Sequence, residues 1–204
     1  MTNVLQFSQK PPSKFGFERV RKRKKESPAK GGQLGLFTGP GGQVFRLPTD
    51  IGPFEEALLL DERGDVRAKE AYRHAISDND SAADAYCNLG IIESKAGETA
   101  KAFDCFTNSL ERDPRHFESH FNLGNLYFEA GDLRLARMHY EMGAELESNF
   151  PNLYFNLGLV LALMEEFQPA IDAFKKYQQL TPKKEGRKAD DVMISLERSL
   201  ALKR

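Results

Sequence analysis

The 204-residue sequence has no tryptophan, only two cysteines and no apolar run close to the length of a membrane span. A transmembrane helix needs roughly 18 or more consecutive apolar residues, so we expect none. Cys87 and Cys105 are too few for a disulfide framework, and we expect buried free thiols, with a disulfide as the alternative. The N-terminus lacks a charged region followed by an apolar stretch, which argues against a secretory signal and predicts a cytoplasmic protein.

Catalytic and cofactor motifs are also missing. The segment TGPGGQ at 38–43 lacks the lysine of a phosphate-binding loop, so we interpret it as a turn or linker. His116 and His120 are four residues apart on a predicted helix, but no third ligand has a matching spacing. No Ser/His/Asp or Cys/His arrangement stands out. The sequence therefore predicts a non-catalytic protein with no cofactor and no metal.

Charge is distributed unevenly, although the net charge is only −1. Residues 1–50 hold ten Lys/Arg against three Asp/Glu, whereas residues 51–204 hold nineteen against twenty-seven. The first 50 residues also contain five prolines and seven glycines, with small apolar islands at 15–17, 34–37 and 44–47. Such a composition buries too little apolar surface to offset the entropy of ordering. We predict a disordered basic tail over residues 1–50.

The tail contains one dense basic run, which could bind nucleic acid or another polyanion and release counterions. Targeting, for example to an import receptor or anionic lipid, and a purely solubilising role are the alternatives. The run consists of Arg19, Arg21, Lys22, Arg23, Lys24 and Lys25.

From about residue 51 the sequence repeats with a period of 34 residues. The tripeptide Asn-Leu-Gly occurs at 88–90, 122–124 and 156–158, and the turn-like segments KAGE, EAGD and MEEF follow at 95–98, 129–132 and 164–167. Pro114 and Pro182 lie two periods apart. A unit of this length, with a turn halfway and a proline near its end, is typical of stacked helix–turn–helix repeats.

These repeats resemble the tetratricopeptide repeat family, whose pattern is W-x2-L-G-x2-Y, then A-x3-F, then P. The second unit matches with Tyr86, Leu89, Gly90, Ala102, Phe106 and Pro114, and the next two units match in register. Glu93, Leu161 and Ser148 depart from the pattern. The resemblance implies an all-α, right-handed superhelical solenoid of four repeats over 51–182, at about 51–81, 82–115, 116–149 and 150–183. Residues 184–204 should add a C-terminal capping helix, because Ala189, Val192, Leu196 and Leu200 follow helical spacing.

In this family the first helix of each unit lines a concave groove, and the residue before Leu-Gly points into it. The resemblance thus implies a ladder of amides that can hold the backbone of an extended peptide. Local packing is the alternative for the asparagines, and packing between units is the alternative for the phenylalanines. The implied groove residues are Asn88, Asn122, Asn156, Cys87, Ile91, Phe121, Asn125, Phe128, Phe155 and Leu159.

We therefore predict an adaptor or scaffold that binds an extended segment of another protein. The alternative is a nucleic-acid-associated regulatory factor whose tail contacts DNA or RNA while the repeats recruit a partner. A clamp for an acidic C-terminus is not expected, because Cys87, Phe121 and Phe155 stand where lysines would be needed and Glu118 has the wrong sign. We also predict that residues 34–48 dock in or beside the acidic solenoid's own groove and compete with outside partners.

Overall fold

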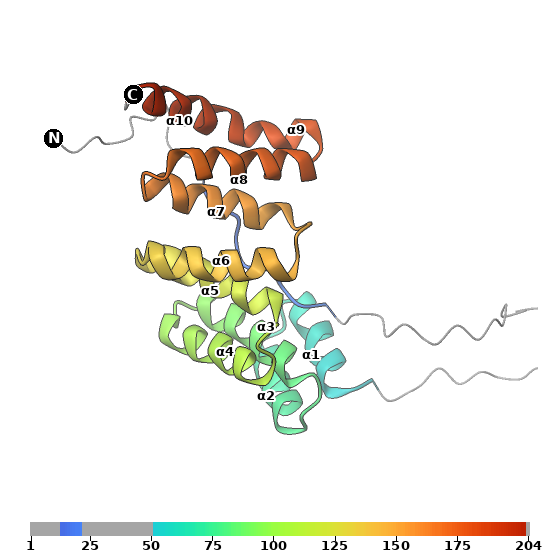
Figure 1. Ribbon diagram of the computed structural model, residues 1–204. Coiled ribbons are helices and arrows are strands. Elements are labelled where there is room, and N and C mark those ends of the chain that lie inside the picture. The colour runs from blue at the N-terminus through green and yellow to red at the C-terminus, as the bar shows by residue number, and fades with distance from the viewer. Residues whose placement is uncertain (1–12, 22–50, 203–204) are drawn as a thin grey trace, which may run out of the picture.

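In the computed structural model, residues 13–21 and 51–202 are described, and these residues contain helices but no strand. The helices form antiparallel pairs that stack along one axis (Figure 1). The pairs are α1 (Pro53–Glu62) with α2 (Ala68–Ser77), α3 (Ala82–Lys95) with α4 (Thr99–Arg112), α5 (Phe117–Ala130) with α6 (Leu133–Leu146), and α7 (Pro151–Leu163) with α8 (Phe167–Leu180). The predicted all-α solenoid is confirmed. None of the helices in the described residues is long and apolar enough to cross a membrane.

Each Asn-Leu-Gly glycine makes room for an aromatic ring on the second helix of its own unit. A Cβ added at Gly124 would lie 2.6 Å from the Tyr140 ring. A Cβ added at Gly90 or Gly158 would lie 2.8 or 2.9 Å from the rings of Phe106 and Phe174, respectively. All three rings are fully buried. The glycine therefore permits the close approach of the two helices in each unit, and this contact offsets its poor helix propensity.

The turn between the two helices uses a left-handed residue in all four units. Gly64, Gly97 and Gly131 have φ values of 68°, 80° and 81°, and Glu165 has φ 60° in the turn of the fourth unit. Glycine adopts this conformation at no steric cost, whereas glutamate does not. The left-handed turn of the fourth unit is thus kept without the glycine that the other three units use.

The C-terminal end of the solenoid is covered by α9 (Lys183–Gly186), a 3-10 turn (Arg187–Ala189) and α10 (Asp190–Leu202). Ala189, Val192 and Leu196 are buried in the cluster that also holds Phe174 of α8, and Leu200 packs against it partly. The predicted apolar stripe faces the last repeat, so α10 covers the apolar surface that a fifth repeat would otherwise bury.

His120 packs against a second histidine, His139 of α6. Its Nε2 lies 3.1 Å from the Pro114 carbonyl oxygen and its Nδ1 lies 3.1 Å from Nδ1 of His139. Since Nε2–H donates to the carbonyl, Nδ1 of His120 accepts from Nδ1–H of His139. Both rings are then neutral. Burial lowers the pKa of His120, and burial together with His120 lowers the pKa of His139 to about 4.

We expect this pair to make stability depend on pH. A lowered histidine pKa stabilises the fold above the ordinary value near 6.5, and this stabilisation is lost as pH falls from 6.5 towards 4. Between pH 7 and 5, the free energy of unfolding should fall by about 1–2 kcal/mol through His139. Urea unfolding at several pH values measures this. His139→Gln keeps a donor and should flatten the profile, whereas the exposed control His74→Gln should not; identical profiles for both variants would contradict the assignment.

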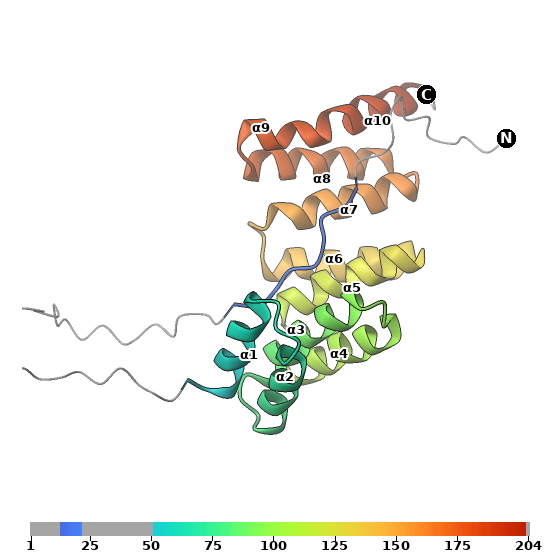
Figure 2. The same cartoon turned by 180° about the vertical axis from the view of Figure 1, so that it is seen from behind.

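The N-terminal region contains a segment with a fixed position, contrary to the prediction of a tail without one. Residues 13–21 are extended and cross the concave side of the solenoid, from α7 past α5 to α1 (Figure 2). Composition did not reveal this because the helices, and not the segment's own residues, supply the partners that order it. The interval predicted to dock, residues 34–48, lies outside the described residues, as do Lys22, Arg23, Lys24 and Lys25.

Candidate peptide-binding groove

The groove is built on the first helices of three successive units, α3, α5 and α7. Asn88, Asn122 and Asn156 occupy the same register on these helices, and each is completely buried beneath residues 13–21. The 34-residue period places them in one row, because equivalent positions of stacked repeats lie on one face.

Each of the three amides binds both backbone groups of one residue in the segment. Asn122 accepts from the Glu18 N–H at 2.8 Å and donates to the Glu18 carbonyl at 2.8 Å. Asn156 does the same with Phe15, at 2.8 and 3.1 Å, and Asn88 with Val20, at 2.9 and 3.0 Å. A side-chain amide has an acceptor oxygen and two N–H donors. It can therefore bond both the N–H and the C=O of one residue, as a neighbouring β-strand would. The segment therefore runs in the direction opposite to the order of the repeats.

A fourth amide, Asn125, fixes the orientation of this ladder. Its Nδ2 donates to the Gly16 carbonyl at 3.1 Å, while its Oδ1 accepts from the Tyr140 hydroxyl at 2.7 Å and from Asn156 Nδ2 at 2.9 Å. Among the described residues, no buried side-chain nitrogen or oxygen is without a hydrogen-bond partner. These hydrogen bonds fix the orientation of the amides towards the bound backbone. A fully satisfied network of this kind specifies one geometry.

Three side chains of the segment make apolar contacts. The Phe15 ring meets Phe155 edge-on at 5.2 Å and lies 6.0 Å from Tyr177, and Phe17 stacks at 6.1 Å on Phe106. Val20 is 3% exposed and belongs to the core cluster that runs from the first unit to α5 of the third. Backbone bonds fix the register, and these side chains supply most of the apolar burial.

Two ion pairs hold the segment at its ends. The Lys14 ammonium lies 2.9 Å from the Glu129 carboxylate, and the Arg19 guanidinium lies 2.9 Å from Asp61 of α1. Arg19 belongs to the basic run predicted to contact a polyanion, and in this structure its charge is paired. Arg21 is exposed. A polyanion role for the run stays a prediction.

Five of the predicted groove residues make a hydrogen bond or a ring contact with the segment. Asn88, Asn122, Asn125, Asn156 and Phe155 contact it, as the bonds and ring distances above describe. Cys87, Ile91 and Leu159 are buried beside the ladder, and Phe128 is half-buried against the C-terminal core cluster. The Cys87 thiol accepts from Asn122 Nδ2 at 3.4 Å.

The Phe121 ring packs on other aromatic rings of the solenoid. Its ring is fully buried and packs at 5.3 Å on Phe150 and 5.9 Å on Tyr140, with Phe117 at 6.3 Å. It therefore joins α5 to the start of α7, which is the packing alternative. The residues that sequence reasoning missed are the segment itself and, on the solenoid, Asp61, Phe106, Glu129 and Tyr177. The apolar island Phe15-Gly16-Phe17 was the available signal.

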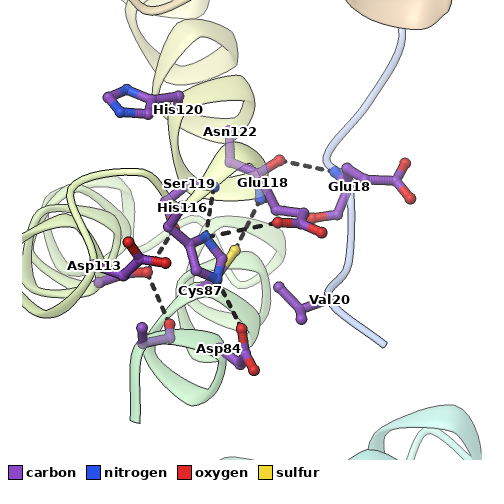
Figure 3. Close-up of polar contacts among 12 residues, drawn as sticks. Glu18, Val20, Asp84, Cys87, Asp113, His116, Glu118, Ser119, His120 and Asn122 are labelled. Atoms are coloured by element: carbon purple, nitrogen blue, oxygen red, sulfur yellow. Dashed lines mark hydrogen bonds and ion pairs between the residues drawn. The ribbon is translucent and has the colours of Figure 1, made fainter. Parts of the chain in front are cut away.

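An acidic cleft of about 810 Å³ opens beside Glu18. Five carboxylates and one guanidinium line it: Glu18, Asp84, Asp113, Glu118 and Glu147, with Arg115. His116, buried at its edge, accepts from the Ser119 N–H through Nδ1 at 3.1 Å and lies 2.9 Å from Asp84 through Nε2 (Figure 3). Because Nδ1 accepts, Nε2–H donates to the Asp84 carboxylate. Among the described residues that line the cleft, five carboxylates therefore face one guanidinium.

Glu18 is the segment residue least suited to this position. Burial, with the Glu118 carboxylate as the next cause, raises the pKa of Glu18. Its carboxyl group is turned away from Glu118 and His116 (Figure 3). The ionised form is therefore disfavoured where the segment docks, although its backbone bonds to Asn122 are short.

The fold and the groove together define a helical-repeat module that holds an extended peptide backbone on its concave face. The tetratricopeptide repeat family matches residues 81–146 and again residues 151–184. The chain is a tetratricopeptide repeat protein.

Relatives share the repeats over only part of their length. The chain is 26% identical over 121 residues to the BBSome complex member BBS4 of Bos taurus, covering 59% of this chain and 23% of that protein. It is 33% identical over 129 residues to the protein O-mannosyl-transferase TMTC3 of Homo sapiens, covering 58% and 14%. The chain thus spans less than a quarter of the length of these curated relatives, and the match concerns the repeats rather than the whole proteins.

A solved structure has the same architecture. The first tetratricopeptide repeat domain of Spaghetti (RPAP3), bound to the HSP90 peptide SRMEEVD, superposes with a TM-score of 0.55 at 19% identity. The superposition covers 58% of this chain and 93% of that one. At this identity the likeness shows the fold.

Proposed function

We propose that the protein is a non-catalytic adaptor that binds an extended segment of a partner protein in the groove, and that residues 13–21 occupy this groove until the partner displaces them. One observation carries the proposal: Asn88, Asn122 and Asn156 each bind both backbone groups of a residue in that segment. Backbone bonds of this kind are independent of the ligand's side chains, so they accept any extended chain of suitable register.

The repeat family and its peptide-bound neighbour support this proposal. Tetratricopeptide repeats are protein-interaction modules, and the groove here has the backbone-reading amides and aromatic anchors that peptide recognition uses. Because the segment is tethered, its effective concentration at the groove is of the order of millimolar. An outside ligand must therefore bind better than the segment or arrive when the segment is displaced.

The test is binding of a fluorescent peptide of residues 13–21, followed by anisotropy. The full chain carrying Phe15→Ser and Phe17→Ser loses the two aromatic anchors of its own segment, so its groove should be open. We expect this variant to bind the peptide at least about tenfold more tightly than the native chain does, because the tethered competitor is weakened.

The matched control distinguishes the groove from the rest of the surface. Adding Asn122→Asp to the opened variant should abolish binding, whereas adding Asn108→Asp on α4, the same chemical change outside the ladder, should leave it unchanged. The proposal is overturned if the opened chain fails to bind the peptide, or if Asn122→Asp and Asn108→Asp behave alike.

A further inference from the structure

The docked segment shows which chemistry the groove reads at each position. Backbone bonds are made at Phe15, Gly16, Glu18 and Val20, and apolar contacts at Phe15, Phe17 and Val20. Every one of these positions is complementary to the groove except Glu18. A different side chain at position 18 is therefore the change that could raise the affinity of another ligand most.

The charged groups around Glu18 are mostly negative, whereas a glutamate is stabilised by positive neighbours. Glu18 lines the cleft with Asp84, Asp113, Glu118 and Glu147, and among the described residues Arg115 is the only cation that lines the cleft. Within residues 13–21 and 51–202, the one ion pair of Glu118 is with Nδ1 of His116 at 3.8 Å, and that nitrogen already accepts from Ser119. The carboxylates alone would be an ordinary solvated surface. Here, however, the ladder holds the backbone of residue 18 directly beside these carboxylates. The carboxylates can therefore select the side chain that a ligand carries at this position.

We propose that the outside ligand of this groove is an extended segment with a lysine or arginine at the position that Glu18 occupies, an aromatic residue three positions earlier and an aliphatic residue two positions later. This inference rests on the proposed function. A basic side chain at that position turns into the cleft and pairs with Glu118 and Asp84, whereas Glu18 turns away from Glu118. Residues 13–21 are then a complete match to the groove in backbone and apolar contacts and a mismatch in charge, which makes the segment displaceable.

The inference is tested with four peptides of residues 13–21 on the opened full chain that carries Phe15→Ser and Phe17→Ser. The first has the native sequence, the second carries Glu18→Gln and the third carries Glu18→Lys. The fourth carries Ser13→Lys together with Glu18→Gln, so that its net charge equals that of the third. Position 13 is exposed in the docked segment, so this lysine points to solvent.

We expect affinity to rise from glutamate to glutamine to lysine at position 18, with about a tenfold span at low salt. The Glu18→Lys peptide should bind about fivefold more tightly than its charge-matched control, because surface pairs contribute roughly up to 1 kcal/mol. The span should shrink at 0.5 M salt through screening. Glu118→Gln in the protein should reduce the advantage of lysine, whereas Glu141→Gln, on α6, should not.

The outcomes separate the inference from the function on which it rests. If the peptides bind through Asn122 but lysine at position 18 gives no advantage over the charge-matched control, the inference is wrong and the proposed function stands. If none of the four peptides binds the opened chain, the proposed function itself fails. The inference is upheld if the position-specific advantage appears and depends on Glu118.

Discussion

Changing Asn122 to aspartate should release residues 13–21 from the groove. The substitution replaces the Nδ2 donor to the Glu18 carbonyl with an oxygen that repels it, and it puts a carboxylate where the native side chain is completely buried. Leaving the segment docked would then cost both a hydrogen bond and the desolvation of a charge. We expect the docked state to lose about 2–3 kcal/mol, and the amide exchange of Phe15, Glu18 and Val20 to quicken by about a hundredfold.

Hydrogen–deuterium exchange of the full chain measures this directly, because the N–H groups of these three residues donate to the ladder. Asn108→Asp serves as the control, and circular dichroism checks that the helices persist in both proteins. Equal protection of the segment in Asn122→Asp and in the native chain would show that the ladder does not hold it. The native rates should not vary with protein concentration, since the contact is within one chain.

Changing Gly124 to alanine should destabilise the solenoid itself. The new Cβ would lie 2.6 Å and 2.7 Å from two atoms of the Tyr140 ring, and the ring is fully buried with its hydroxyl bonded to Asn125. The ring has no free space to enter, so α5 and α6 must separate. We expect a loss of about 2–3 kcal/mol in the free energy of unfolding, the range of overpacked cores.

Urea unfolding followed by circular dichroism measures that loss, and two other glycines calibrate it. Gly158→Ala, whose Cβ would lie 2.9 Å from Phe174, should cost less than Gly124→Ala. Gly186→Ala should be neutral or stabilising by up to about 1 kcal/mol, because its nearest neighbour is 3.6 Å away and its backbone is helical. If Gly124→Ala and Gly186→Ala are equally stable, the steric role assigned to the Asn-Leu-Gly glycine is wrong.

The repeated tripeptide shows how far sequence reasoning reaches in this protein. Leucine was expected in the buried stripe, and Leu89, Leu123 and Leu157 are at most 8% exposed. Glycine was expected at a close helix approach, and an aromatic ring lies against each of the three glycines. Asparagine was expected on an open groove, and it is instead completely buried. The first two roles follow from the helix carrying the residue, whereas the burial of asparagine depends on a segment more than 65 positions away in the chain.

The aromatic residues show the corresponding limit. Phe121 and Phe155 occupy equivalent positions in successive repeats, yet Phe121 packs between α5 and the start of α7 whereas Phe155 touches Phe15. The difference arises because the Phe121 ring packs on Phe150, which directly precedes α7. The repeat pattern does not specify a phenylalanine at that place. Likewise, composition predicted a tail without fixed contacts, because composition measures only what a segment can bury by itself.

The sequence by itself determined the period, the helix pairs, the closing helix and the row of amides, since each depends on residues close in the chain or one repeat apart. Only the tertiary structure decided what lies on that row. The stacking of three repeats brings Asn88, Asn122 and Asn156 into the spacing of an extended backbone, and residues 15–20 match that spacing. The hydrogen-bond partners of these residues come from three different helices. The local sequence around residue 15 therefore could not identify these partners.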